Sequence, residues 1–230
     1  MIPGFNLTEL TNSVGPLAVV LILAAIIFAE SGLLIGFFLP GDTVLFSAGF
    51  LVYGGILHFD IHLMVLILFI AAVLGDSVGY LFGRRIGRKI FKRPDSILFR
   101  QENMERAEAF YEKHGGKTII IARFVPIVRT FAPIIAGVGK MSYKVFLTFN
   151  MIGAGLWAVG VTYAGYFAGG WLEKMGVKPE SIDKVILPVI LIVILASLLP
   201  ALYHLFKDKK QRDAVWAATK RQVNVLLRRK

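Results

Sequence analysis

The distribution of basic residues constrains this chain more than any other feature of its sequence. Residues 1–83 contain no Lys or Arg, whereas residues 84–117 contain ten and residues 207–230 contain nine. The two basic blocks flank long apolar runs, and only 18% of all residues are charged. A soluble domain has about 25% charged residues, and a nucleic-acid-binding protein carries its basic residues over a folded surface. The pattern instead follows the positive-inside rule of integral membrane proteins.

Three apolar segments are long enough to cross a bilayer, which takes about 20 residues in a helix. We predict transmembrane helices at 61–83, 145–172 and 185–206. The basic loop 84–117 and the tail 207–230 contain apolar residues at helical spacing among their charges, which predicts amphipathic surface helices on the cytoplasmic side. The expected protein is therefore an all-α integral membrane protein. Its membrane domain covers residues 1–206, and a basic cytoplasmic tail follows.

The apolar segment 118–139 is predicted to be a re-entrant hairpin rather than a span. The segments 145–172 and 185–206 cross out and back, so Lys140 and Lys144 must lie on the same side as the cytoplasmic tail. Segment 118–139 follows the cytoplasmic loop and therefore begins and ends on that side. If it crossed the membrane, the basic tail would lie outside, against the charge rule.

The first half of the chain repeats this pattern in inverted form. Segment 14–57 is divided by Pro40 and Gly41, which stop a helix, and we interpret it as a second re-entrant hairpin with the N-terminus outside. Two pairs of similar short segments are 86 positions apart: 38–40 with 124–126, and 79–83 with 165–169. Each half is then one hairpin followed by one span, an architecture typical of transporters. Chance similarity is the alternative, because glycine and aromatic residues are common in membrane helices.

Five ionisable residues lie inside apolar segments: Glu30, Asp42, Asp76, Arg123 and Arg129. A charge at the bilayer centre costs at least about 2.5–3.5 kcal/mol, so these residues must be paired, hydrated or protonated. One interpretation is a polar cavity for an anionic group and a proton. The other is a set of structural ion pairs that hold the hairpins together.

The arginines and the carboxylates of the hairpins suit different ligands. Arg123 and Arg129 are predicted to bind phosphate, because guanidinium binds it bidentately and stays charged. Glu30 and Asp42 are predicted to load and release a proton. Supporting roles are assigned to Pro40, Gly41, Asp76, Pro126 and Pro133. We expect no cofactor, metal or nucleic-acid partner, and an enzyme is disfavoured because no histidine lies at the intramembrane core positions.

Three ordered motifs between residues 28 and 205 resemble the signatures of the DedA (VTT/SNARE-associated) membrane proteins. The first is Glu30 followed by Phe-Leu-Pro-Gly-Asp-Thr at 38–43, and the second is Gly-Asp-x-x-Gly-Tyr-x-x-Gly-Arg-x-x-Gly at 75–87. The third is Arg-Phe-x-Pro-x-x-Arg-x-x-x-Pro-x-x-Ala-Gly at 123–137. It is followed by Met141, Phe146, Asn150, Gly153 and Trp157. The resemblance implies two facing re-entrant hairpins and lipid translocation that depends on the proton-motive force. In bacterial members the implied cargo is undecaprenyl phosphate, and in eukaryotic relatives it is phospholipid. The acids essential in the family resemble Glu30 and Asp42, and the essential arginines resemble Arg123 and Arg129.

The prediction is therefore a multi-pass flippase of the bacterial inner membrane that moves undecaprenyl phosphate or a related lipid phosphate with proton coupling and supports envelope maintenance. The alternatives are a proton-coupled exporter of small ions or drugs, a non-selective phospholipid scramblase, and a structural or assembly factor. The expected partners are membrane lipids and protons. A face of glycines at 75, 79, 83 and 87 favours close helix packing and permits a homo-oligomer.

Overall fold

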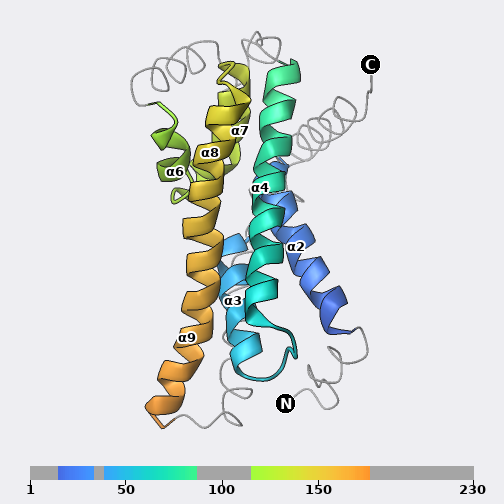
Figure 1. Cartoon of the computed structure of the whole chain (residues 1–230), viewed down its shortest axis with the longest axis vertical. Coiled ribbons are helices and arrows are strands. Elements are labelled where there is room, and N and C mark those ends of the chain that lie inside the picture. Colours follow the sequence, from blue (N-terminus) through green and yellow to red (C-terminus); the bar gives the residue numbers. More distant parts are fainter. Residues whose placement is uncertain (1–14, 34–38, 87–114, 177–230) are drawn as a thin grey trace, which may run out of the picture.

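The computed structural model describes residues 15–33, 39–86 and 115–176 (Figure 1). The regular elements of this part are all helices: α2 (Pro16–Gly32), α3 (Gly41–Tyr53), α4 (Ile61–Ile86), α6 (Lys117–Ala122), α7 (Pro126–Val138), α8 (Tyr143–Ala154), the π-helix η3 (Gly155–Val159) and α9 (Gly160–Lys174). Three predicted segments lie outside the described residues. They are most of the basic loop 84–117, the third span 185–206 and the tail 207–230.

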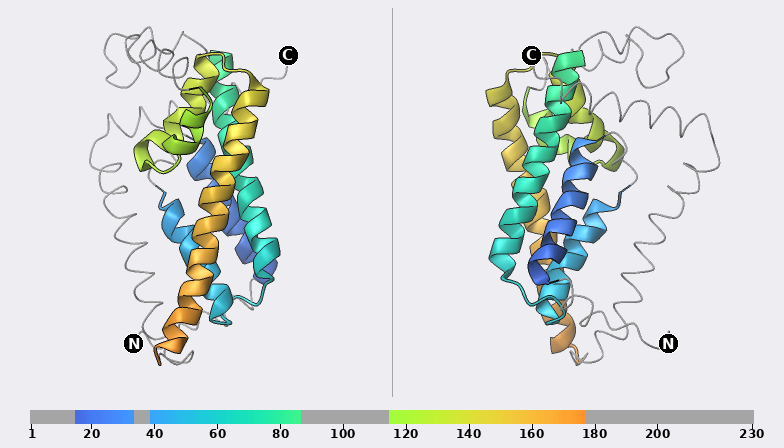
Figure 2. Two further views of the ribbon diagram at one scale, coloured as in Figure 1. Left: turned by 60° about the vertical axis from the view of Figure 1, so that its left-hand side comes forward. Right: turned by 90° about the vertical axis from the view of Figure 1, so that its right-hand side faces the viewer.

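Two long apolar helices run the length of the bundle and contact each other (Figures 1 and 2). One is α4, and the other is the continuous run of α8, η3 and α9. The apolar stretches Ile61–Arg85 and Tyr143–Lys174 contain 25 and 32 residues, which is enough for each to cross a bilayer. They coincide with two of the predicted spans, 61–83 and 145–172.

Two pairs of shorter helices lie in opposite halves of the bundle (Figures 1 and 2). The helices α2 and α3, with 17 and 13 residues, occupy one half, and α6 and α7, with 6 and 13 residues, occupy the other. Each of them is shorter than the roughly 20 residues of a complete span. Pro40 precedes the first residue of α3 and Pro126 begins α7. A proline at a helix start loses no hydrogen bond, because the first N–H groups have no intrahelical partner.

The second helix of each short pair packs against the long helix of the other half. Helix α3 packs on α9, and α7 packs on α4. Glycine permits close approach at both crossings: Gly165 faces the carbonyl oxygen of Phe46, and Gly83 faces the carbonyl oxygen of Ile134. A Cβ atom at either glycine would overlap that oxygen. Farther along α4, Gly75 meets the backbone of α2, so this glycine face is occupied by helices of the same chain.

The crossing of α4 and α7 leads to a prediction about stability. We expect Gly83→Ala to lower the thermal unfolding midpoint of the detergent-purified protein, because the added methyl group would push α7 away from α4. Overpacking of this kind costs about 1–3 kcal/mol. The matched control is Gly160→Ala, whose Cβ would meet nothing within 4 Å. Loss of the monodisperse peak on size-exclusion chromatography after heating measures both variants, and equal midpoints would contradict the prediction.

Candidate functional site

A cluster of charged side chains joins the two helix pairs to each other and to the long helices. Its members come from both halves of the chain. Glu30 is on α2, Asp42 on α3, Asp76 on α4, Arg123 directly after α6, and Arg129 on α7. The cluster therefore contains all five ionisable residues that the sequence places inside apolar segments.

Arg129 joins the two helix pairs. Its Nη1 donates a hydrogen bond to Oδ1 of Asp42 at 2.9 Å, and its Nη2 donates to Oε1 of Glu30. Glu30 is buried, whereas the side chain of Asp42 is 54% exposed. One guanidinium group thus connects an interior carboxylate with a carboxylate at the protein surface.

The carboxylate of Glu30 rests against the backbone of Gly41. A Cβ atom at position 41 would overlap this carboxylate, so only glycine leaves room for it. Gly41 is the first residue of α3, directly before Asp42. The break at Pro40 and Gly41 therefore places both carboxylates within reach of the same arginine.

Arg123, Asp76 and Asn150 form a second polar group, which is buried. Nη1 of Arg123 donates to Oδ2 of Asp76 and, at 3.0 Å, to Oδ1 of Asn150. Nδ2 of Asn150 donates in turn to the carbonyl oxygen of Val73 at 3.2 Å. Only 5% of Arg123 is exposed. This group ties the end of α6 to both long helices.

Trp157 connects the two groups. Its Nε1 donates to Oδ1 of Asp42 at 2.5 Å. The guanidinium carbons of Arg123 and Arg129 lie 4.9 Å and 5.0 Å from the centroid of its ring, within the roughly 6 Å range of cation–π attraction. Trp157 is buried and belongs to the π-helix η3. Such π-helical turns inside α-helices are frequent at functional sites.

Several buried polar atoms of the cluster have no hydrogen-bond partner among the described residues. They are Nε and Nη2 of Arg123, Nε of Arg129, and Oε2 of Glu30. A buried donor without a partner costs about 1–3 kcal/mol, so these atoms are available to water, a proton or a ligand. Free guanidinium donors suit an oxyanion, and a free carboxylate oxygen suits a proton.

Comparison with known proteins places the chain among its relatives. The family model described as the VTT domain matches residues 15–167, which include the whole charged cluster. The chain belongs to the VTT-domain (DedA) family. Protein DedA of Escherichia coli strain K12 is 45% identical over 205 residues, which cover 89% of this chain and 90% of that protein. No solved structure matches the chain.

Two mycobacterial relatives agree with the VTT-domain assignment. A membrane protein of Mycobacterium leprae is 42% identical over 186 residues, or 81% of this chain and 80% of that protein. A membrane protein of Mycobacterium tuberculosis H37Rv is 43% identical over 177 residues, or 77% and 74%. These names and the two span-length helices make the chain a membrane protein.

The arrangement of this VTT domain refines the sequence analysis. The sequence grouped Arg123 with Arg129 as one phosphate site, whereas the structure gives them different carboxylate partners. Asp76, to which the sequence analysis assigned a supporting role, pairs with Arg123. Among the supporting prolines, Pro133 is buried inside α7 and faces Gly79 of α4 rather than an arginine.

Trp157 and Asn150 belong to the family motif, but no role at the site was predicted for them from the sequence. Both are buried and both bind charged members of the cluster. One signal was available, because the N–H of a buried tryptophan and the amide of a buried asparagine need hydrogen-bond partners. In an apolar span such partners are scarce, so these two residues were candidates for the polar site.

Proposed function

We propose that this protein moves a lipid phosphate, undecaprenyl phosphate or a related lipid, across the bacterial inner membrane with proton coupling. It acts in this proposal as a transporter and not as an enzyme, and its partners are the lipid and protons. The observation that carries the proposal is the position of Arg129, which lies between Glu30 and Asp42 where the two helix pairs meet.

Competition for Arg129 gives a physical basis for the coupling. With every group ionised, the two arginines of the cluster face the three carboxylates Glu30, Asp42 and Asp76, so the cluster would repel a phosphate. Protons on Glu30 and Asp42 remove the negative charges that occupy Arg129. The guanidinium fork is then free for phosphate oxygens. Proton binding and phosphate binding therefore favour each other, and linkage makes this relation reciprocal.

The surface beside the arginines suits an amphipathic substrate. Phe124, Val125 and Val128 lie in the segment between Arg123 and Arg129, and their side chains are exposed. In our proposal the phosphate group occupies the arginine cluster, and the apolar tail lies along these side chains in the hydrocarbon. The exposed carboxylate of Asp42 fits the same picture, because a charge at membrane depth requires water or a polar head group.

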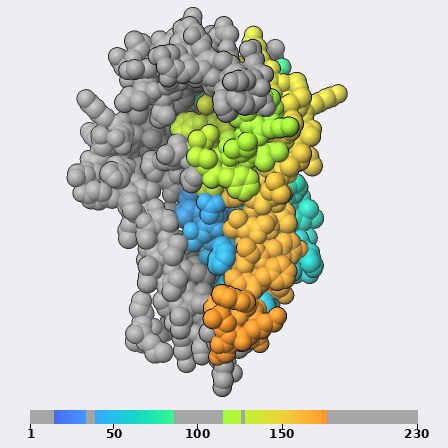
Figure 3. Space-filling model, turned by 90° about the vertical axis from the view of Figure 1, so that its left-hand side faces the viewer, coloured from blue at the N-terminus to red at the C-terminus, as the bar shows by residue number. Residues whose placement is uncertain are grey.

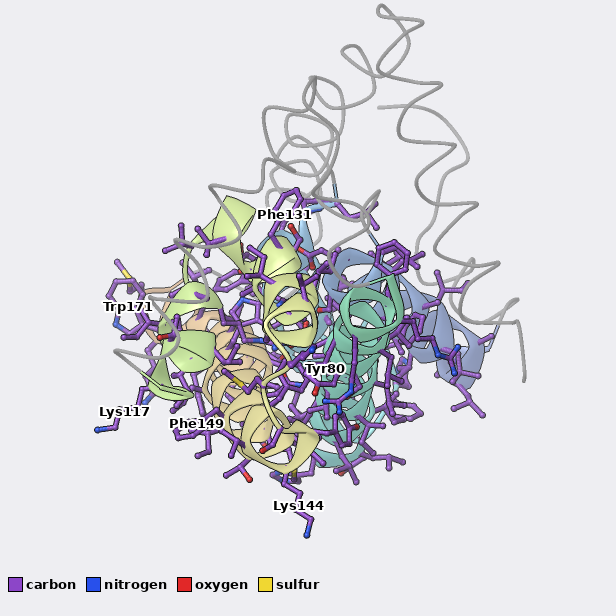
Figure 4. The ribbon with its side chains drawn as sticks, turned by 90° about the horizontal axis from the view of Figure 1, so that it is seen from above. Tyr80, Lys117, Phe131, Lys144, Phe149 and Trp171 are labelled. Atoms are coloured by element: carbon purple, nitrogen blue, oxygen red, sulfur yellow. The ribbon has the colours of Figure 1, made fainter. Side chains whose placement is uncertain are left out.

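The topology in this proposal follows from the short helices and the charges. The pairs α2–α3 and α6–α7 are re-entrant hairpins that enter from opposite faces as inverted repeats. Arg84 and Arg85 lie in the last turn of α4, and α6 and α8 belong to the same half of the bundle (Figure 1). Lys117 and Lys144, near the starts of α6 and α8, point outward from the bundle (Figure 4). The end of this half is cytoplasmic by the positive-inside rule. The tail 207–230 lies on the same side.

Lipid translocation in proteoliposomes tests the proposed function. A fluorescent polyprenyl phosphate and a fluorescent glycerophospholipid are loaded separately, with and without a pH gradient, and an impermeant quencher reports the exposed leaflet. We expect movement of the polyprenyl phosphate that depends on the gradient, and loss of that dependence in Glu30→Gln, which cannot carry the proton. The matched control is Glu173→Gln, because Glu173 is exposed near the end of α9, outside the cluster.

Each other outcome points to one alternative. Movement of both lipids without a gradient would indicate a scramblase, and the carboxylates would then be structural ion-pair partners. Absence of movement in folded, correctly inserted protein would contradict the lipid proposal and favour a proton-coupled exporter of small ions or drugs.

A further inference from the structure

Trp157 occupies a position that core packing alone does not explain. A buried indole needs one acceptor for its N–H, and a backbone carbonyl of a neighbouring helix is sufficient for that purpose. Here the acceptor is the carboxylate of Asp42, which comes from the other half of the chain. The ring also lies near both guanidinium groups of the cluster. A single side chain thus contacts one proton-binding residue and both anion-binding residues of the proposed function.

The local backbone supports this position. The five residues of η3 form a π-helix between α8 and α9, in a helix that is otherwise regular. A π-helical turn holds more residues than an α-helical turn and is rare, and it marks functional sites more often than ordinary helix does. Trp157 is the central residue of η3. The irregular turn therefore coincides with the one indole in the charged cluster.

We propose that Trp157 is the positioning residue that couples protonation of Asp42 to the anion-binding arginines. While Asp42 is ionised, its charge-assisted hydrogen bond holds the indole, and the indole and Asp42 together hold Arg129. A proton on Asp42 weakens both bonds, because hydrogen bonds to a neutral carboxyl group are weaker than bonds to a carboxylate. The indole and Arg129 then move together toward an arriving phosphate. This inference rests on the proposed function, since it names the residue through which its two binding events communicate.

Among the charged groups around Trp157, Asp42 is the carboxylate that is exposed to solvent. Those in contact with the indole or paired with its neighbours are Asp42 from α3, Arg129 from α7, Glu30 from α2, Arg123 from the α6–α7 connection and Asp76 from α4. Among the three carboxylates, Glu30 and Asp76 are buried, and Asp42 is exposed. Of these three carboxylates, Asp42 is therefore the one that water can reach.

Tryptophan fluorescence tests the inference without a transport assay. The chain has three tryptophans, and Trp171→Phe with Trp216→Phe leaves Trp157 as the only one. Trp171 is 65% exposed and points away from the bundle, so its replacement spares the cluster (Figure 4). The emission of Trp157 is recorded in detergent from mildly basic to clearly acidic pH, through the range in which exposed carboxyl groups take up protons. The series is run with farnesyl phosphate, with farnesol, and without either.

The expected result has three parts. The emission changes with pH, and Asp42→Asn in the same background removes that change. Farnesyl phosphate raises the midpoint of the titration, because it binds the protonated form more tightly, whereas uncharged farnesol does not. Emission that is independent of pH, or a pH response that persists in Asp42→Asn, would overturn the link between Asp42 and Trp157. A pH response that farnesyl phosphate leaves unchanged would overturn the coupling to the anion site.

Transport by Trp157 variants separates coupling from a structural role. Trp157→Phe keeps an aromatic face for the arginines but lacks the N–H. We expect the gradient-driven rate to fall about tenfold, as loss of a hydrogen bond to a charged group implies, and the dependence of transport on pH to weaken. A purely structural role predicts the same factor of loss at every pH. If the wild-type protein moves no lipid while the fluorescence responses are present, the proposed function fails and the coupling stands.

Discussion

Arg129→Lys is expected to reduce gradient-driven translocation of polyprenyl phosphate about 100-fold, although the positive charge is retained. Arg129 uses Nη1 for Asp42 and Nη2 for Glu30, and a lysine ammonium is a single point charge that cannot reproduce this planar fork. Losing charge-assisted hydrogen bonds to the phosphate costs up to about 3 kcal/mol, which corresponds to roughly 100-fold in rate. The initial rate in proteoliposomes at equal amounts of inserted protein measures the effect.

The control for this substitution is Arg85→Lys. Arg85 is exposed in the last turn of α4, more than two turns beyond Asp76, and the Arg85→Lys protein should transport at the wild-type rate. The unfolding midpoint of Arg129→Lys must also be recorded, so that loss of fold is not mistaken for loss of function. A stable Arg129→Lys protein that transports within about twofold of wild type would contradict a phosphate-binding fork and favour a structural or assembly role.

Asp76→Asn is expected to destabilise the protein by about 3–5 kcal/mol, because Arg123 would keep a buried charge without its counter-ion. Asn150 and the ring of Trp157 remain beside Arg123, but neither carries a negative charge. The thermal unfolding midpoint in detergent reports the loss. The matched control is Asp60→Asn at the start of α4, where the exposed side chain accepts the N–H of Leu63 at 2.8 Å. Asparagine fills such a cap about as well as aspartate, so this control should unfold near the wild-type midpoint.

Because Asp76 and Arg123 form an ion pair, we expect the effects of substituting them on stability to be strongly non-additive. Asp76→Asn combined with Arg123→Gln leaves no buried charge in this group and should recover most of the lost stability, as a double-mutant cycle can show. Transport should stay low in the double variant if the free Nε and Nη2 of Arg123 serve the substrate. Additive losses in the cycle would contradict the assignment of Asp76 as the counter-ion.

Much of this architecture was accessible from the sequence, because charges in apolar segments are costly enough to stand out. Glu30, Asp42, Asp76, Arg123 and Arg129 were found in this way. Their pairing was not accessible, since it depends on which helices cross, and the crossings are determined by close contacts at particular glycines. The sequence could not show, for example, that Gly83 lies against α7.

The role of Trp157 was hidden for a different reason. Helical periodicity assumes a regular turn, and the π-helix at Gly155–Val159 changes the direction of every side chain that follows it. The residue types Gly-Leu-Trp-Ala-Val do not by themselves predict a π-helical turn.

The surface of α3 that packs against α9 stays uncovered during synthesis until α9 has been made. Helix α3 ends at Tyr53, but the helix that covers it, α9, begins only at Gly160. Figure 3 shows these distant segments side by side on one face, α3 in blue beside α9 in orange. Chains are made and inserted from the N-terminus, so the helices α2 and α3 are made before α9, on which α3 packs. The two halves can therefore reach their final packing only together, after the second long helix has entered the membrane.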